Sequence, residues 1–127
     1  MSQLSHILLI FLGGGLGATA RWSLDSWVRK HSSIGHFPLG IFVVNMLGCL
    51  LIGVLAGWLS RYKGAQNWCS PFLITGFLGA FTTFSTFTLH LVENHLQRQW
   101  GIAILYAGLS VMLGFCLALG GYVLTRN

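Results

Sequence analysis

The sequence predicts an all-α integral membrane protein with four transmembrane helices, the third of them broken. Two features of the chain lead to this fold class. Of the 127 residues, 54% are hydrophobic and only 7% are charged, whereas about a quarter of a soluble domain is charged. Four segments are also apolar over the roughly 20 residues that a helix needs to cross a bilayer. The segments run from Leu4 to Ala20, Leu39 to Leu59, Phe72 to Leu91 and Trp100 to Leu124.

These segments leave no room for a soluble domain, so residues 1–127 are predicted to form one four-helix transmembrane domain. The first segment lacks the basic leader of a signal peptide, and its stretch from Gly13 to Ala18 is typical of close helix packing. In the second segment, Gly53 and Gly57 form a G-x-x-x-G pair. Such a pair lets another helix approach closely, either within the chain or in an oligomer.

The third segment contains an unusual run from Phe81 to Phe87, in which four hydroxyl groups are interspersed with three phenyl rings. A hydroxyl without a partner is costly in hydrocarbon. Threonine, serine and phenylalanine are also mediocre helix formers. We therefore expect a broken helix whose irregular backbone lines a binding site or a pore.

The segments between the spans carry nearly balanced positive charge. Four spans place both termini on one face with Arg61, Lys63 and Arg126, and the other face holds the remaining basic residues, Arg21, Arg29, Lys30 and Arg98. Orientation follows an excess of Lys and Arg on the cytoplasmic side, and three against four is almost no excess. Insertion in both orientations would permit an antiparallel, dual-topology homodimer. A single orientation fixed by an insertion factor is the alternative.

Several classes of function are disfavoured by what the spans lack. The two acidic residues, Asp25 and Glu93, lie near the ends of spans, although proton-coupled transporters need an ionisable group within the membrane. No nucleophile–base pair or carboxylate–histidine cluster suggests an enzyme. The net charge of +5 is dispersed over short loops, which favours lipid headgroups or an anionic permeant over nucleic acid.

Neutral hydrogen-bond donors and aromatic rings remain as candidates for a site. Phe84 and Phe87 are neighbours on a helix, and the positive edges of their rings could favour a dehydrated anion. Ser85 or Thr86 could donate hydrogen bonds to the same ion. The alternative is a pair of core phenylalanines beside hydroxyls that bond to preceding carbonyls. Asn45, in the second span, could hand an anion to the rings or simply join two helices.

Further polar candidates lie in the third and fourth spans. Tyr106 and Ser110 share a helix face and could form a polar ladder, although a tyrosine can also be an interfacial anchor. His90 could extend a polar vestibule or be a hydrogen-bonded structural histidine. A break near Gly79 would free backbone carbonyls between Gly76 and Thr82 that could coordinate a hard cation such as sodium.

Three stretches form a pattern that covers nearly the whole chain. The first runs from Gly13 to Arg21, the second contains Pro38-Leu39-Gly40 followed by Val44-Asn45, and the third and most specific runs from Thr75 to Phe87. Together they resemble the Fluc (CrcB) fluoride channels. The resemblance implies passive, fluoride-selective export from a microbial cytoplasm. It also implies a dual-topology homodimer with two pores, in the inner (plasma) membrane.

The resemblance further implies roles for individual residues. Phe84 and Phe87 would form an aromatic box around the pores. The polar residues at or near the fluoride path would be Asn45, Ser85, Thr86, Tyr106 and Ser110. A structural sodium ion at the dimer interface would be held by the backbone carbonyls of Gly79 and Thr82 from both subunits.

One position departs from the family pattern, because His90 stands where many relatives carry an acid three residues after the second box phenylalanine. This departure concerns the vestibule and the pH dependence of transport. The alternative function is a small multidrug-type, proton-coupled exporter, which would need a membrane carboxylate that the span from Leu4 to Ala20 lacks. A non-transporting subunit of a membrane assembly is a third class.

Overall fold

The structure, a computed structural model, describes residues 2–126, without the side chain of Lys63. Met1 and Asn127, the ends of the predicted domain, lie outside the described residues. The described elements, in chain order, are α1 (Gln3–His31), α2 (Leu39–Arg61), η1 (Lys63–Ala65), α3 (Gln66–Cys69), η2 (Ser70–Leu78), α4 (Gly79–Phe81), α5 (Phe84–Leu96) and α6 (Trp100–Arg126).

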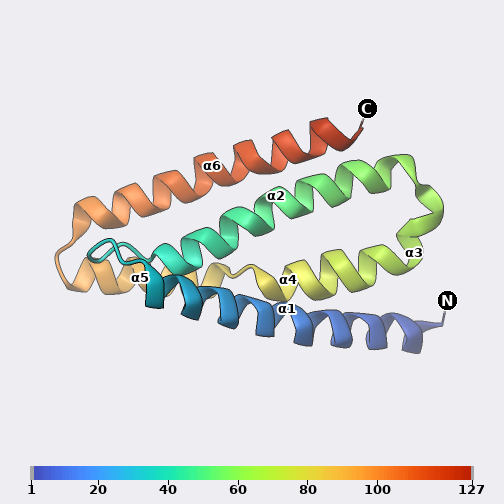
Figure 1. The fold of residues 1–127 in the computed structure, drawn as a ribbon, viewed down its shortest axis with the longest axis horizontal. Coiled ribbons are helices and arrows are strands. Elements are labelled where there is room, and N and C mark those ends of the chain that lie inside the picture. Colours follow the sequence, from blue (N-terminus) through green and yellow to red (C-terminus); the bar gives the residue numbers. More distant parts are fainter. Residues whose placement is uncertain (1, 127) are drawn as a thin grey trace.

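Four helical segments within residues 2–126 are long and apolar enough to cross a membrane, as the sequence predicts. They are α1, α2, the segment Gln66–Leu96 and α6. The segments run alongside one another, and both ends of the chain lie at the same end of the bundle (Figure 1). The prediction of an all-helical protein with four apolar spans is therefore confirmed.

Helix α1 is longer than predicted, because it continues past Ala20 to His31. Its last two turns contain an ion pair between Asp25 and Arg29, whose side chains approach to 2.6 Å. Basic residues in a final turn also interact favourably with the helix dipole. The prediction that the charges after Ala20 lie in a loop was wrong, because it placed the end of the helix where hydropathy falls. The residues concerned are Arg21, Arg29 and Lys30.

Glycines allow α2 and α6 to pack with their backbones close together. A Cβ atom on Gly53 would overlap the backbone of Ala118, and one on Gly57 would lie 2.5 Å from the Tyr122 carbonyl oxygen. The Thr125 hydroxyl adds a hydrogen bond of 2.9 Å to the Val54 carbonyl. The G-x-x-x-G pair therefore serves a contact within the chain, the first of the two uses that the sequence allowed.

The third segment begins with a short α-helix and continues as a π-helical stretch, η2. In this stretch, hydrogen bonds join residues five positions apart; for example, the Gly79 N–H donates to the Ile74 carbonyl. Helix α1 lies directly on η2. A Cβ atom on Gly13 would overlap the backbone of Phe72, and one on Gly17 that of Phe77.

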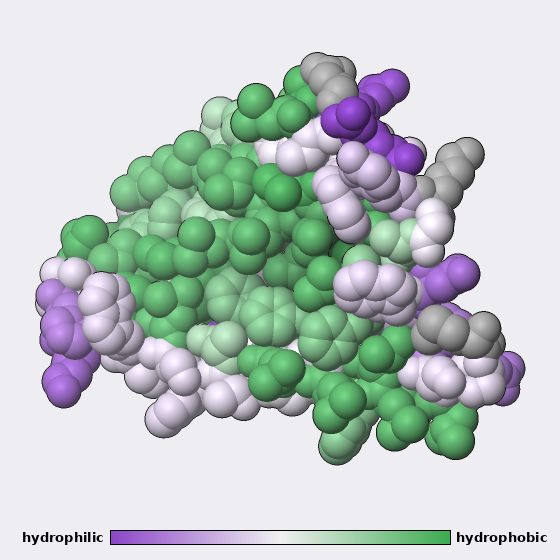
Figure 2. Space-filling view, turned by 45° about the vertical axis from the view of Figure 1, so that its right-hand side comes forward, coloured by the Kyte–Doolittle hydropathy of each residue, from purple (hydrophilic) through white to green (hydrophobic). Residues whose placement is uncertain are grey.

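On the face shown in Figure 2, hydrophobic side chains dominate and the most hydrophilic ones gather at the two ends of the bundle. The buried core is small and contains Val44, Leu78 and Phe81. A protein with so little buried apolar surface and so much exposed apolar surface matches a lipid environment rather than water. Together with the four apolar helices, this surface identifies a multi-pass membrane protein.

Candidate functional site

The non-helical backbone of the third segment lies at Thr82 and Thr83, between α4 and α5. Both residues are extended, with ψ angles of 157° and 124°. The Thr83 hydroxyl accepts a hydrogen bond from the Thr86 N–H at 3.3 Å and so caps α5. Thr82 and Thr83 lie within the run from Phe81 to Phe87, in which the sequence predicts a broken helix. Gly79, the other position considered for a break, is helical, with φ −61° and ψ −36°. Threonine favours an extended backbone and helix capping, which explains why the interruption lies at Thr82 and Thr83.

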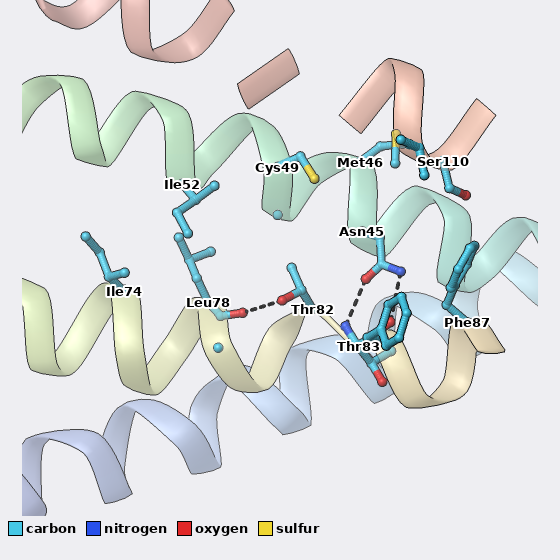
Figure 3. A pocket seen from close by; sticks show the side chains of 14 residues that line it. Asn45, Met46, Cys49, Ile52, Ile74, Leu78, Thr82, Thr83, Phe87 and Ser110 are labelled. Carbon is cyan, nitrogen blue, oxygen red and sulfur yellow. Dashed lines mark hydrogen bonds between the residues drawn. The ribbon is translucent and has the colours of Figure 1, made fainter. Parts of the chain in front are cut away.

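Asn45 of α2 holds this extended backbone in place. Its Oδ1 atom accepts a hydrogen bond from the Thr83 N–H at 2.9 Å, and its Nδ2 atom donates to the Thr83 carbonyl at 3.1 Å (Figure 3). The carboxamide therefore satisfies both backbone groups of one residue, as a neighbouring strand would. Of the two roles that the sequence allowed for Asn45, the joining of two helices is the one seen here. Because an amide carries two N–H groups, the bond to Thr83 uses only one of them.

The hydroxyl groups that follow the interruption gather around Thr83, whose side chain is nearly buried. The Thr83 Oγ1 atom lies 3.2 Å from the Ser85 hydroxyl and 3.2 Å from the Thr86 hydroxyl. Ser85 and Thr86 were predicted site residues, whereas Thr83 was not singled out. A threonine immediately before the first residue of a helix is a typical N-cap, and this signal could have identified Thr83.

A pocket of about 380 Å³ opens beside the interruption, between α2, η2, α4, α5 and α6. It brings together predicted site residues from distant parts of the chain (Figure 3). Those on its wall are Asn45, Gly79, Thr82, Phe84, Phe87 and Ser110. The other predicted residues, Ser85, Thr86 and Tyr106, lie outside this wall.

Several wall residues were not predicted from the sequence. Gly48 matters most, because a Cβ atom there would overlap the methyl group of Thr82. A glycine at this point lets α2 approach the extended backbone closely. Most other unpredicted wall residues are apolar or sulfur-containing, and nothing in their type distinguishes them from residues that face lipid. They are Met46, Cys49, Ile52, Ile74, Leu78 and Val111.

The two predicted box phenylalanines are neighbours, with ring centroids 5.7 Å apart and planes inclined by 34°. Their surroundings differ sharply. Phe84 is 77% exposed, whereas Phe87 is buried and its ring centroid lies 5.0 Å from that of Tyr106. The pair therefore reaches from the open pocket to the interior of the bundle.

Tyr106 is fully buried in a cluster of aromatic side chains. Phe37, from the loop before α2, meets its ring edge-on at a centroid distance of 5.4 Å, and His90 lies at 6.3 Å. Among the described residues, no hydrogen-bond partner is found for the Tyr106 hydroxyl or for the buried His90 Nδ1 atom. Tyr106 is thus not an interfacial anchor. Ser110, its predicted companion four residues later on α6, lines the pocket, whereas Tyr106 does not. Phe87 lines the pocket and also contacts the Tyr106 ring.

Comparison with known proteins identifies the family. A family model described as CrcB-like protein, Camphor Resistance (CrcB), matches residues 8–122. The chain belongs to this family. The resemblance inferred from the sequence motifs is therefore confirmed.

Curated CrcB-like relatives match the chain over most of its length. A protein of Dichelobacter nodosus is 45% identical over 86% of this chain and 93% of the relative. A Nitrobacter hamburgensis protein is 40% identical, with 96% and 98% covered, and a Cereibacter sphaeroides protein is 42% identical, with 98% of both chains covered. The first and third are named fluoride-specific ion channel FluC, and the second fluoride-specific ion channel FluC 2.

Proposed function

We propose that this protein is a fluoride-selective channel that lets fluoride leave the cytoplasm passively. The observation that carries the proposal is the similarity, over nearly the entire chain, to relatives named fluoride-specific ion channels. The site supports it chemically, because neutral donors and aromatic rings line the pocket and no carboxylate does. Such a lining offers an anion hydrogen bonds and positive ring edges without repelling it.

The ion path that we propose runs along the hydroxyl and aromatic groups between α2, α5 and α6. Fluoride holds its water tightly, so the path must replace lost hydration with donors at close range. Phe84 and Phe87 would present ring edges, and the second N–H of Asn45 would donate a hydrogen bond. The remaining donors in this path are the hydroxyl groups of Ser85, Thr86, Tyr106 and Ser110.

The functional unit that we propose is an antiparallel, dual-topology homodimer. A single chain leaves Phe84 largely exposed and its pocket open, so a second copy would be needed to enclose the ion. The near-balance of basic residues between the two ends of the bundle supports insertion in both orientations. With two opposed copies, the same surface meets itself across a twofold axis. The membrane would be the inner (plasma) membrane.

A sodium ion at the dimer interface fits the backbone around the interruption. In a continuous α-helix, the carbonyls of Gly79 and Thr82 would accept from the N–H groups of Thr83 and Thr86. Those N–H groups instead donate to Asn45 Oδ1 and to Thr83 Oγ1. Both carbonyls are thus deprived of their usual helical donors, and both residues line the pocket.

Neutral carbonyl oxygens from both subunits would coordinate one sodium ion, and the ion would thereby link the two subunits. Because the ligands are backbone atoms, Thr82→Ser should retain the ion. Removal of sodium should weaken the dimer, which gel filtration in sodium-free and sodium-containing buffers would measure. An identical elution profile in both buffers would contradict this role.

The proton-coupled exporter remains a second candidate because α1 is longer than predicted. The sequence argument against it was the absence of a carboxylate from the first span, yet Asp25 lies on α1 and is largely buried. Its carboxylate is held in an ion pair with Arg29 on the same helix and does not line the pocket. We therefore retain the channel as the proposed function.

Vesicles that contain the purified protein separate these functions. A channel releases fluoride without a proton gradient and does not release chloride. An exporter moves an organic cation in exchange for protons, and loses this activity in Asp25→Asn. A protein that does neither would be a non-transporting subunit.

A further inference from the structure

The buried hydroxyl of Tyr106 and the buried Nδ1 atom of His90 both lack a hydrogen-bond partner among the described residues. Their rings lie on neighbouring helices, α6 and α5, with centroids 6.3 Å apart and planes inclined by 54°. Polar atoms that are buried without partners are rare in proteins and indicate a missing water or ion. Because the two rings are neighbours, one occupant between them could bind both atoms.

The two groups lie next to the proposed fluoride path. Phe87 is three residues before His90, on the same side of α5, and its ring packs against Tyr106 at a centroid distance of 5.0 Å. We call the end of the bundle with the loop between α1 and α2 (residues 32–38) the loop end. An ion that leaves the Phe84–Phe87 pair towards this loop end would therefore meet Tyr106 and His90 next. Phe37 and Phe42, from the preceding loop and α2, contribute only phenyl rings to this cluster.

The charges close to His90 are mostly negative. Burial disfavours the charged form of the imidazole, whereas the carboxylates of Glu93, one turn later on α5, and of Asp25, paired with Arg29 on α1, favour it. Two carboxylates against one guanidinium would repel an anion. A protonated imidazole would offset that repulsion and would present N–H donors from both ring nitrogens.

We propose, on the basis of the fluoride-channel function above, that His90 and Tyr106 together hold one fluoride ion at the loop end of the path. Tyr106 donates through its hydroxyl and His90 donates through Nδ1. Protonation of His90 fixes a hydrogen on Nδ1 and removes the net negative charge around the site. Fluoride passage is therefore faster when His90 is protonated.

The test is fluoride efflux from vesicles, measured from about pH 8 to about pH 5.5, where histidine is the side chain that ordinarily changes charge. Both sides of the membrane are held at the same pH. Protein-free vesicles at each pH measure the leak of hydrogen fluoride through lipid. His90→Gln keeps a donor and removes the titration, and His95→Gln, on the same helix beside Trp100, is the control.

We expect parental efflux to rise as the pH falls, the rise to persist in His95→Gln, and the pH profile to be flat in His90→Gln. Tyr106→Phe, which keeps the ring and the packing, should also reduce the rise. If the parental rate is independent of pH, or if His90→Gln and Tyr106→Phe both keep the parental profile, the proposal is wrong. Absence of parental fluoride efflux at every pH would instead overturn the channel function on which the proposal rests.

Discussion

At the scale of single residues, the first prediction concerns Phe84 and Phe87, which both line the pocket. Phe84→Ile and Phe87→Ile keep most of the volume and apolarity of the side chain, but they remove the positive ring edge. We expect fluoride efflux from vesicles to fall about tenfold or more, which corresponds to a barrier higher by at least about 1.4 kcal/mol. Gel-filtration profiles should be unchanged.

The matched control for this pair is Phe72→Ile, near the start of the same membrane segment and outside the pocket. Its efflux should stay near the parental rate. Parental rates in both Phe84→Ile and Phe87→Ile would show that the aromatic pair does not select the ion.

Asn45 carries the second prediction. In Asn45→Asp, an ionised carboxylate can still accept from the Thr83 N–H but cannot donate to the Thr83 carbonyl. The lost bond and the buried charge should cost about 1–3 kcal/mol or more of stability, and the negative charge should repel a permeant anion. We expect a lower midpoint of thermal unfolding in detergent together with little fluoride efflux. Asn67→Asp, at an exposed position of α3, adds the same charge and should do neither.

Residue types predicted much of the site. Asn45, Phe84, Phe87 and Ser110 are conspicuous because polar or aromatic side chains stand out in apolar spans, and all four line one pocket. Thr83 was missed because its importance lies in its backbone groups, which Asn45 binds. That Ser110 lines the pocket while Tyr106 lies outside it could not be predicted, since this depends on how the helices pack.

At the scale of elements, close packing of α1 on η2 depends on two glycines. A Cβ atom on Gly17 would overlap the backbone of Phe77, which cannot move as a side-chain end could. Gly17→Ala should therefore destabilise the fold by about 1–3 kcal/mol, seen as a lower unfolding midpoint in detergent. Gly15→Ala is the control, because nothing lies within 4 Å of a Cβ atom there. Equal midpoints for the two variants would contradict the packing argument.

Hydropathy predicted the four spans but not their exact extent or their local helix type. The stretch after Ala20 is less apolar, yet it stays helical to His31 with the help of the Asp25–Arg29 ion pair. The π-helical stretch Ser70–Leu78 could not be predicted either, because the sequence pattern does not distinguish hydrogen bonds five residues apart from those four apart. This π-helical stretch packs closely against Gly13 and Gly17 of α1.

At the scale of the whole molecule, the balanced charge of the two ends predicts that both orientations are populated. A variant with Cys49, Cys69 and Cys116 replaced, and with Asn127→Cys added, would be labelled by an impermeant thiol reagent from each side of the membrane. We expect about half of the protein to react from either side, because three basic residues against four give almost no orientational preference. Labelling from one side alone would contradict dual topology.

Selectivity for fluoride over chloride is the central claim, and it belongs to the assembled protein. The most direct measurement follows the efflux of each anion from vesicles that contain the purified protein, with a potassium ionophore to balance charge. The account predicts rapid fluoride efflux and chloride efflux no faster than from protein-free vesicles. Equal efflux of the two anions, or fluoride efflux at the protein-free rate, would contradict it.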